Sequence, residues 1–170
     1  MTDATVSLPP GYREIPDRMN IAAELIDRIE ERGFGDRAAF VWDDGELSFA
    51  EFALRVNKLA HGFASNGIEK GMPVLVRMNN CHEFAEGVLA LLKVGALPVL
   101  QNSLLGQEEV EYVLDHSDAR AAVTLGGLAE PLVNLSAKLP EGIFAARGAP
   151  GGTTAFESLI DTAPDGPFVT

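Results

Sequence analysis

The fold is decided by one stretch, residues 73–101, which reads PVLVRMNNCHEFAEGVLALLKVGALPVLQ. Residues 74–78 are an apolar run without helical spacing, whereas the apolar residues from His82 to Val94 recur with the helical period. Gly95 suits the left-handed residue that ends many helices, and residues 97–101 form a second apolar run. This order predicts a right-handed βαβ unit. Because its strands are apolar at successive positions, we expect the unit in the middle of a sheet.

The helix of this unit is expected to be buried on several sides, because its apolar residues cover more than one face. These residues are Ala85, Val88, Leu89, Leu91 and Leu92. We expect Val88 and Leu92 to lie in the core between the two strands. The substitution Leu92→Ala would then cost on the order of 2–5 kcal/mol through the cavity that it leaves.

A helix and a hairpin are expected upstream. Asn20 can cap a helix whose apolar positions recur about once per turn up to Ile29, before Gly33 and Gly35 end it. Residues 38–42 read as a strand, Asp43–Glu46 as a tight turn of the Asp-Gly type and Leu47 as the start of a short return strand. Together they predict a small N-terminal hairpin.

The remaining elements alternate between strands and helices. Ser48 and Glu51 form a capping-box pattern at the start of a helix that should end at Gly67. Downstream we expect a loop over 102–106, a helix over 107–117, a strand over 120–125, a helix over 128–139, a weaker strand over 143–145 and a helical turn over 156–160. This alternation predicts an α/β fold, an open and mostly parallel sheet with helices on both faces.

The chain is expected to form one domain with short ends. Residues 1–18 are rich in proline and should form an extended N-terminal arm, residues 19–165 the α/β unit, and residues 166–170 a tail. Its 170 residues suffice for a single core.

Composition limits the partners. The formal net charge of −12 argues against nucleic acid and anionic membranes, since both need a basic face. Cys81 is the only cysteine, so no disulfide framework exists and a reducing compartment fits. Residues 1–10 lack the pattern of a signal peptide, and no run reaches the roughly 20 apolar residues of a membrane span. These features predict a cytoplasmic protein.

Open α/β sheets bind ligands at the carboxyl ends of their strands, which here are residues 78–80, 101–103 and 125–127. None has the glycine spacing of a dinucleotide site, which argues against a nucleotide-binding redox domain. Gly126-Gly127 could hold an anion on free amides, but a plain turn is favoured. Residues 148–154 resemble a phosphate loop without its lysine, and a flexible surface connection is favoured there.

The titratable side chains give no catalytic constellation. His61, His82 and His116 lie far apart in sequence without metal-binding spacing. Cys81 begins a helix, a position that can lower a thiol pKa, although an inert, partly buried thiol is favoured. A further group, Glu108, Glu109, Glu111 and Asp115, reads as a solvated helix face. We therefore assign no catalytic, cofactor-binding or metal-ligating residue.

Five stretches in order resemble the adenylate-forming enzymes, the superfamily of acyl-CoA synthetases and adenylation domains. Residues 47–52, LSFAEF, resemble the first core motif of that superfamily, and residues 92–99, LKVGALPV, resemble the second. Asn57–Ala60, Gly67–Val74 and Tyr112–Arg120 also match in order and spacing.

This resemblance implies the N-terminal subdomain of an ATP-dependent carboxylate–CoA ligase. The parent enzyme would use ATP, magnesium and CoA, whereas the family's phosphate loop, ending in Pro-Lys, follows this region and is not in the chain. Residues 74–80 and 102–105 most resemble ligases of the benzoate and 2-aminobenzoate type, although Ser103 stands where many relatives have proline. The resemblance leaves the acid unassigned.

The chain alone is expected to be a catalytically silent scaffold that binds no cofactor. Its partners would be the remaining domains of the parent enzyme, and an exposed apolar face could support a homo-oligomer. The alternative is a stand-alone α/β binding or regulatory module derived from the same fold.

Overall fold

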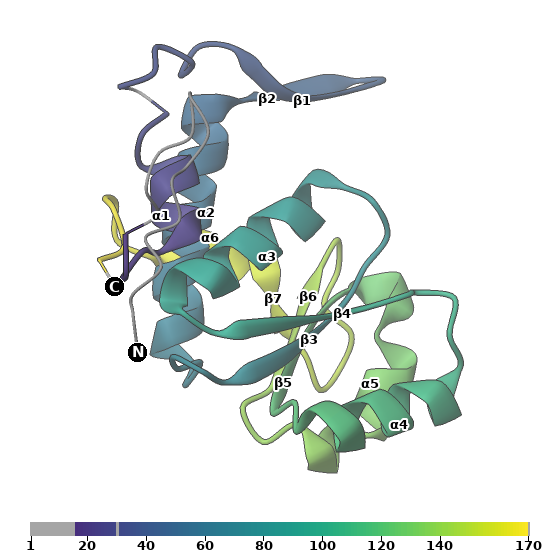
Figure 1. The fold of residues 1–170 in the computed structure, drawn as a ribbon. Coiled ribbons are helices and arrows are strands. Elements are labelled where there is room, and N and C mark those ends of the chain that lie inside the picture. The colour runs from purple at the N-terminus through teal and green to yellow at the C-terminus, as the bar shows by residue number, and fades with distance from the viewer. Residues whose placement is uncertain (1–15, 30, 170) are drawn as a thin grey trace, which may run out of the picture.

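A five-stranded parallel sheet forms the centre of the protein (Figure 1). The computed structural model describes residues 16–29 and 31–169, so most of the expected arm, residues 1–15, lies outside the described residues. The strands follow the spatial order β4-β3-β5-β6-β7. They are β3 (Pro73–Arg77), β4 (Leu97–Gln101), β5 (Ala121–Leu125), β6 (Ile143–Ala146) and β7 (Thr154–Ala155).

Helices cover both faces of this sheet, which confirms the predicted fold class (Figure 1). On one face lie α3 (His82–Val94), α2 (Phe49–Ser65) and α6 (Phe156–Thr162), and α1 (Ile21–Ile26) packs against α3. The other face packs against α4 (Gln107–Ser117) and α5 (Glu130–Asn134). Side chains alternate along each strand, so Val74 and Val76 enter the first core while Leu75 enters the second.

The sequence placed the βαβ unit β3–α3–β4 in the middle of the sheet, and this is right for β3 and wrong for β4. Strand β3 lies between β4 and β5, whereas β4 is an edge strand. Leu97 and Leu100 of β4 are 54% and 60% exposed, respectively. Pro98 lacks an amide proton, which an edge strand tolerates on its unpaired side. An apolar run therefore did not distinguish a buried strand from an apolar edge.

Two further expectations fail beyond β5. The continuous helix predicted over 128–139 is broken into a 3₁₀ turn at Gly126–Leu128, the short α5, and a second 3₁₀ turn at Ser136–Lys138. Its apolar anchors, Leu132, Leu135 and Leu139, are still buried, because successive turns preserve a spacing of three or four. The strand rated weaker, β6, is buried along its whole length and pairs with β7, which the sequence reading missed.

The N-terminal elements agree with the sequence except in length. Helix α1 ends at Ile26, with turns continuing to Ile29. Asn20 caps it through a 3.0 Å bond from the Ala23 amide, and its own Nδ2 donates to the carbonyl groups of Leu92 and Lys93, also at 3.0 Å. One side chain therefore joins the start of α1 to the end of α3.

The predicted hairpin and the helix ends are present. Strands β1 (Ala38–Trp42) and β2 (Gly45–Ser48) pair antiparallel. Ser48 and Glu51 form both bonds of the capping box at the start of α2. Gly95 ends α3 with φ +87°, a backbone conformation that favours glycine.

Within the described residues, no helix is both long and apolar enough to span a bilayer. The cytoplasmic location stays a prediction.

Candidate functional site

Two of the three expected ligand-binding stretches meet at the carboxyl edge of the sheet. The Ser103 hydroxyl donates to Asn79 Oδ1 at 2.5 Å, which joins the segment after β3 to the segment after β4. A hollow of about 450 Å³ lies there, lined by residues 78–80, 100–104 and Phe84. The third stretch, Gly126-Gly127, lines a separate hollow of about 400 Å³.

The geometry at Gly126 favours a turn over an anion site. A Cβ atom at Gly126 would lie 2.3 Å from the carbonyl oxygen of Gly148, so glycine is needed for the close approach of two backbone segments. A carbonyl oxygen in that position repels an anion. The Glu130 side chain, which lines the same hollow, adds a carboxylate.

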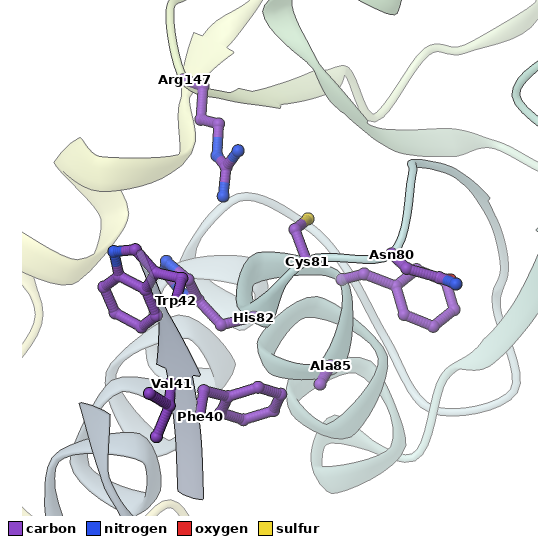
Figure 2. A pocket seen from close by; sticks show the side chains of 9 residues that line it. Phe40, Val41, Trp42, Asn80, Cys81, His82, Ala85 and Arg147 are labelled. Carbon is purple, nitrogen blue, oxygen red and sulfur yellow. The ribbon is translucent and has the colours of Figure 1, made fainter. Parts of the chain in front are cut away.

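A further hollow, of about 590 Å³, lies between the β1–β2 hairpin and the first turn of α3 (Figure 2). Its lining residues are Phe40, Val41, Trp42, Asn80, Cys81, His82, Phe84, Ala85 and Arg147. The Trp42 ring stacks on His82 with centroids 5.1 Å apart. Arg147, which follows β6, extends toward the same space from the opposite side (Figure 2).

A network of charged side chains, of which Arg147 lines this hollow, joins α2, α3 and the segment after β6. Arg147 donates from Nε and Nη2 to Glu83 at 2.7 and 2.9 Å. Arg55 of α2 donates in the same two-pronged way to Glu86, at 2.6 and 3.1 Å. The His82 Nδ1 atom lies 3.0 Å from Glu86 Oε1. Such paired geometry is the strong form of an arginine–carboxylate contact.

Both carboxylates are buried, and each is paired with an arginine. Burial opposes ionisation of Glu83, but hydrogen bonds, led by those from Arg147, outweigh it and hold the Glu83 pKa below its usual value. Burial lowers the pKa of Arg55, and the bonds to Glu86 more than offset this, so the Arg55 pKa lies above its ordinary value. The pair with Arg147 therefore stabilises the charged form of Glu83.

Cys81 does not form a nucleophile with the adjacent His82. Burial and a hydrogen bond to the Glu83 carboxylate raise the pKa of the Cys81 thiol to about 11, so the thiol stays protonated at neutral pH. The raised pKa of Cys81 is the opposite of the lowered thiol pKa that a helix N-terminus can produce. It agrees with the prediction of an inert thiol.

The three histidines remain apart in the structure. His61 lies edge-on to Phe168, His116 stacks on Tyr112, and His82 lies under Trp42. In the part of the chain that the structure describes, no three histidine, cysteine or acidic side chains converge as metal ligands.

The glycine-rich segment 148–154 offers little to a triphosphate. It is exposed, and β7 begins at its last residue. The basic residue that precedes it, Arg147, is held by Glu83. Residues 148–154 contain no basic side chain, so they offer no positive charge to a nucleotide phosphate.

The sequence reading missed the five side chains that shape this region: Trp42, Arg55, Glu83, Glu86 and Arg147. A signal was present, because Glu83 and Glu86 stand in a helix that is otherwise almost wholly apolar. Charged residues are seldom buried unless they are paired, so their presence there indicated partners from other elements.

Comparison with known proteins places this region in context. The AMP-binding enzyme family matches residues 28–158. The benzoate–CoA ligase of Thauera aromatica is 31% identical over 160 residues, which cover 92% of this chain and 30% of that protein. A medium/long-chain-fatty-acid–CoA/3-oxocholest-4-en-26-oate–CoA ligase of Mycobacterium marinum is 26% identical over 161 residues, covering 88% of this chain and 29% of that protein.

A solved structure supports the same assignment. The benzoate CoA ligase of Burkholderia xenovorans LB400 superimposes with a TM-score of 0.75 and 26% identity, over 87% of this chain and 29% of that chain. The chain spans about 30% of the length of the relatives that it matches.

Proposed function

This chain belongs to the AMP-binding enzyme family, and from that membership we propose that it is the N-terminal part of an ATP-dependent carboxylate–CoA ligase. The whole enzyme would form an acyl-adenylate and then transfer the acyl group to the CoA thiol. The observation that carries the proposal is the match to a benzoate–CoA ligase across 92% of this chain.

An aromatic acid is the proposed substrate of the whole enzyme. The support is the recurrence of benzoate–CoA ligases among both the sequence relatives and the solved structures. The competing candidate is a fatty acid, because a medium/long-chain ligase also matches 88% of the chain. Substrate assays on the full-length enzyme decide between them.

The role proposed for residues 19–165 is that of a scaffold. Their polar clusters join elements of the fold to one another, as the Arg55–Glu86 and Arg147–Glu83 pairs do. ATP, magnesium and CoA would be held by other parts of the whole enzyme. The remaining domains are the proposed partners of this chain.

A pyrophosphate-release assay tests this proposal. The full-length product should release pyrophosphate with benzoate-like acids and form thioesters with CoA, while residues 1–170 should show neither ATP binding by calorimetry nor acid-dependent pyrophosphate release. Tight ATP binding by residues 1–170 would contradict the scaffold role. A full-length protein inert toward aryl, fatty and short-chain acids would contradict the ligase assignment.

The alternative is a stand-alone binding or regulatory module derived from the same fold, whose stability would come from the ion pairs that join the described elements to one another. It predicts a reading frame that lacks a Ser/Thr-Gly-rich loop ending in lysine soon after Thr170. Sequencing the gene downstream of this codon separates the two candidates.

A further inference from the structure

The tryptophan at the end of strand β1 is fixed on two sides. Trp42 is the only tryptophan of the chain, and its ring stacks on His82 with an interplanar angle of 21°. Gly45, its partner in β2, lies against the same ring, because a Cβ atom there would come within 2.9 Å of indole atoms. A two-stranded hairpin is only marginally stable by itself. These two contacts therefore give a hairpin side chain a defined position.

The histidine of this stack is itself held by buried charges. His82 Nδ1 lies 3.0 Å from Glu86 Oε1, and His82 Nε2 lies 3.3 Å from Glu83 Oε1. The two carboxylates are paired in turn with Arg55 and Arg147, respectively. Burying charges is costly, and apolar residues would often serve a scaffold equally well. The network has the form of a supporting shell that holds a binding wall in place.

The Trp42 ring faces the hollow of about 590 Å³, which has the size of a small-molecule site. Two further aromatic rings, those of Phe40 and Phe84, also line it. In Figure 2, Trp42 and Arg147 extend toward the same space, one from the hairpin and the other from the segment after β6. Sites for small organic molecules are typically lined by apolar and aromatic side chains with a few convergent polar groups. This hollow has both features.

Arg147 offers the hollow an unused edge of its guanidinium group. Its Nε and Nη2 atoms donate to Glu83, which occupies one of the edges on which a guanidinium can hold a carboxylate through two parallel bonds. Within the part of the chain that the structure describes, Arg147 Nη1 has no hydrogen-bond partner, and the side chain is 56% exposed. The edge formed by Nη1 and the second Nη2 proton is therefore available to another carboxylate.

We propose that this hollow binds a small aromatic carboxylate, with its ring beside Trp42 and its carboxylate on the Nη1–Nη2 edge of Arg147. An aromatic ring suits a hollow with three aromatic residues, and a planar carboxylate suits a planar guanidinium edge. All the groups that would hold the ligand belong to this chain. The proposal goes beyond the proposed function and does not depend on it, because the ligand class follows from the lining of the hollow.

The affinity should be modest, because negative charge lies close to Arg147. Glu83 is paired with its side chain, and the Glu157 carboxylate accepts a hydrogen bond from its backbone amide at 2.8 Å. Both carboxylates oppose the approach of an anion. For a ligand of one or two rings we expect a Kd on the order of 1–10 mM.

Two unique side chains report on this hollow. Trp42 gives a single indole signal in a ¹H–¹⁵N spectrum, and Cys81, the only cysteine, lines the same hollow. The 170-residue chain is titrated with benzoate and 2-naphthoate at constant pH and ionic strength. The indole shift is recorded, together with the rate at which a small disulfide reagent modifies Cys81. Cyclohexanecarboxylate, which lacks the aromatic ring, and 2-naphthamide, which lacks the charge, are the control ligands.

Both aromatic carboxylates should shift the Trp42 indole signal and slow the modification of Cys81 in a saturable manner. The larger ring of 2-naphthoate buries more apolar surface, so it should bind more tightly than benzoate. Each control ligand lacks one of the two contacts and should bind at least about tenfold more weakly than its matched carboxylate.

Variants of the chain separate the two contacts. Arg147→Gln removes the guanidinium edge and Trp42→Leu removes the ring, and each should weaken the protection of Cys81 by 2-naphthoate at least about tenfold. Tyr112→Leu is the matched control and should leave the protection unchanged. Tyr112 also stacks on a histidine, His116, and is 67% exposed, but it lies on α4 and does not line the hollow. Arg147→Lys, which keeps a charge beside Glu83 without the planar edge, replaces Arg147→Gln if that variant does not fold.

An indole signal that does not move with 2-naphthoate would overturn the proposal. Equal binding of benzoate and cyclohexanecarboxylate, or unchanged protection in the Arg147 variant, would overturn it as well. These outcomes do not bear on ligase activity, which pyrophosphate release by the full-length product measures separately. Binding of 2-naphthoate as predicted, together with a full-length protein inert toward all acids, would keep this site and refute the ligase.

Discussion

Helices α3 and α4 flank the same edge strand and use their faces in opposite ways. Helix α4 buries Val110 and Leu114 and turns Glu108, Glu109 and Glu111 outward, as an amphipathic surface helix does. Helix α3 buries its charges and leaves Phe84, Val88 and Leu92 only partly buried. Comparing the two helices shows that a high apolar content identifies a central helix. The positions of its charged residues then indicate which half of the helix faces the core of its own domain.

The largest expected effect compares two adjacent leucines of α3. Leu91 is 0% exposed and lies in the main core, so Leu91→Ala should cost about 4 kcal/mol of unfolding free energy through the cavity that it leaves. Leu92 is only partly buried, so Leu92→Ala should cost less than about 1.5 kcal/mol in this chain. Urea denaturation of both variants gives the measurement. Equal losses would mean that the two halves of α3 do not differ in burial, as the sequence reading implied when it placed Leu92 in the core.

The second prediction compares an ion pair on each helix. Arg55→Met leaves Glu86 buried without its guanidinium partner, and we expect a loss of about 3 kcal/mol. Lys138, which pairs with Glu111 and Asp115 on the exposed side of α4, is the control, and Lys138→Met should have no measurable effect because that pair is solvated. Thermal and urea melts of both variants check this. Comparable shifts for the two variants would show that the burial of Glu86 adds nothing to the cost of losing its partner.

The third prediction concerns the N-terminal cap of α2 and has a smaller expected effect. Neither α3 nor α4 begins with a side-chain cap, whereas Ser48 caps α2 through a 3.2 Å bond from the Glu51 amide. Ser48→Ala should cost about 1 kcal/mol, the usual loss for one cap. Ser48→Asp, which retains an acceptor, is the matched control and should stay near the wild-type midpoint. A cost as large as that of Leu91→Ala would mean that local capping, and not core packing, dominates this fold.

The smallest expected effect depends on pH. Arg147 holds the Glu83 pKa below the ordinary value of about 4.3, so the unfolded chain binds a proton more readily than the folded one. The stabilisation is therefore fully present above about pH 4.3 and is lost as pH falls through the lower folded pKa. The stability difference between the wild type and Arg147→Gln should be constant from neutral pH to about pH 5 and shrink below about pH 4. A difference that does not change across this range would show that the pair contributes no charge-dependent stability.

The sequence predicted the layer structure because the relevant signals are local. The strand of residues 74–78, the capping box at Ser48 and the helix end at Gly95 each follow from a few neighbouring residues. The edge position of β4 could not be predicted in this way. The apolar run Leu97–Leu100 looks the same whether or not this chain supplies a second neighbouring strand. Pro98 was the available clue, because proline in a sheet favours an edge.

The candidate site was less predictable, because its members come from distant segments. Arg147 and Glu83 are 64 residues apart, and Arg55 and Glu86 are 31 apart. The local sequence pattern singles out the carboxylate of each pair, because it stands in an apolar helix. It does not identify the arginine that pairs with it. The break in the helix after β5 was not predicted for a different reason. The spacing of Leu132, Leu135 and Leu139 fits a continuous helix and a series of turns equally well.

The orientation of α3 is the central claim, and solvent relaxation enhancement of methyl signals tests it most directly. A soluble paramagnetic agent is added to dilute, methyl-labelled residues 1–170, and the broadening is compared for leucine and valine methyl groups of α3 and α4. The account predicts stronger broadening at Val88, Leu89 and Leu92 than at Leu91, Val94, Val110 and Leu114. Broadening as weak at Leu92 as at Leu91 would contradict it, because the two halves of α3 would then be equally buried.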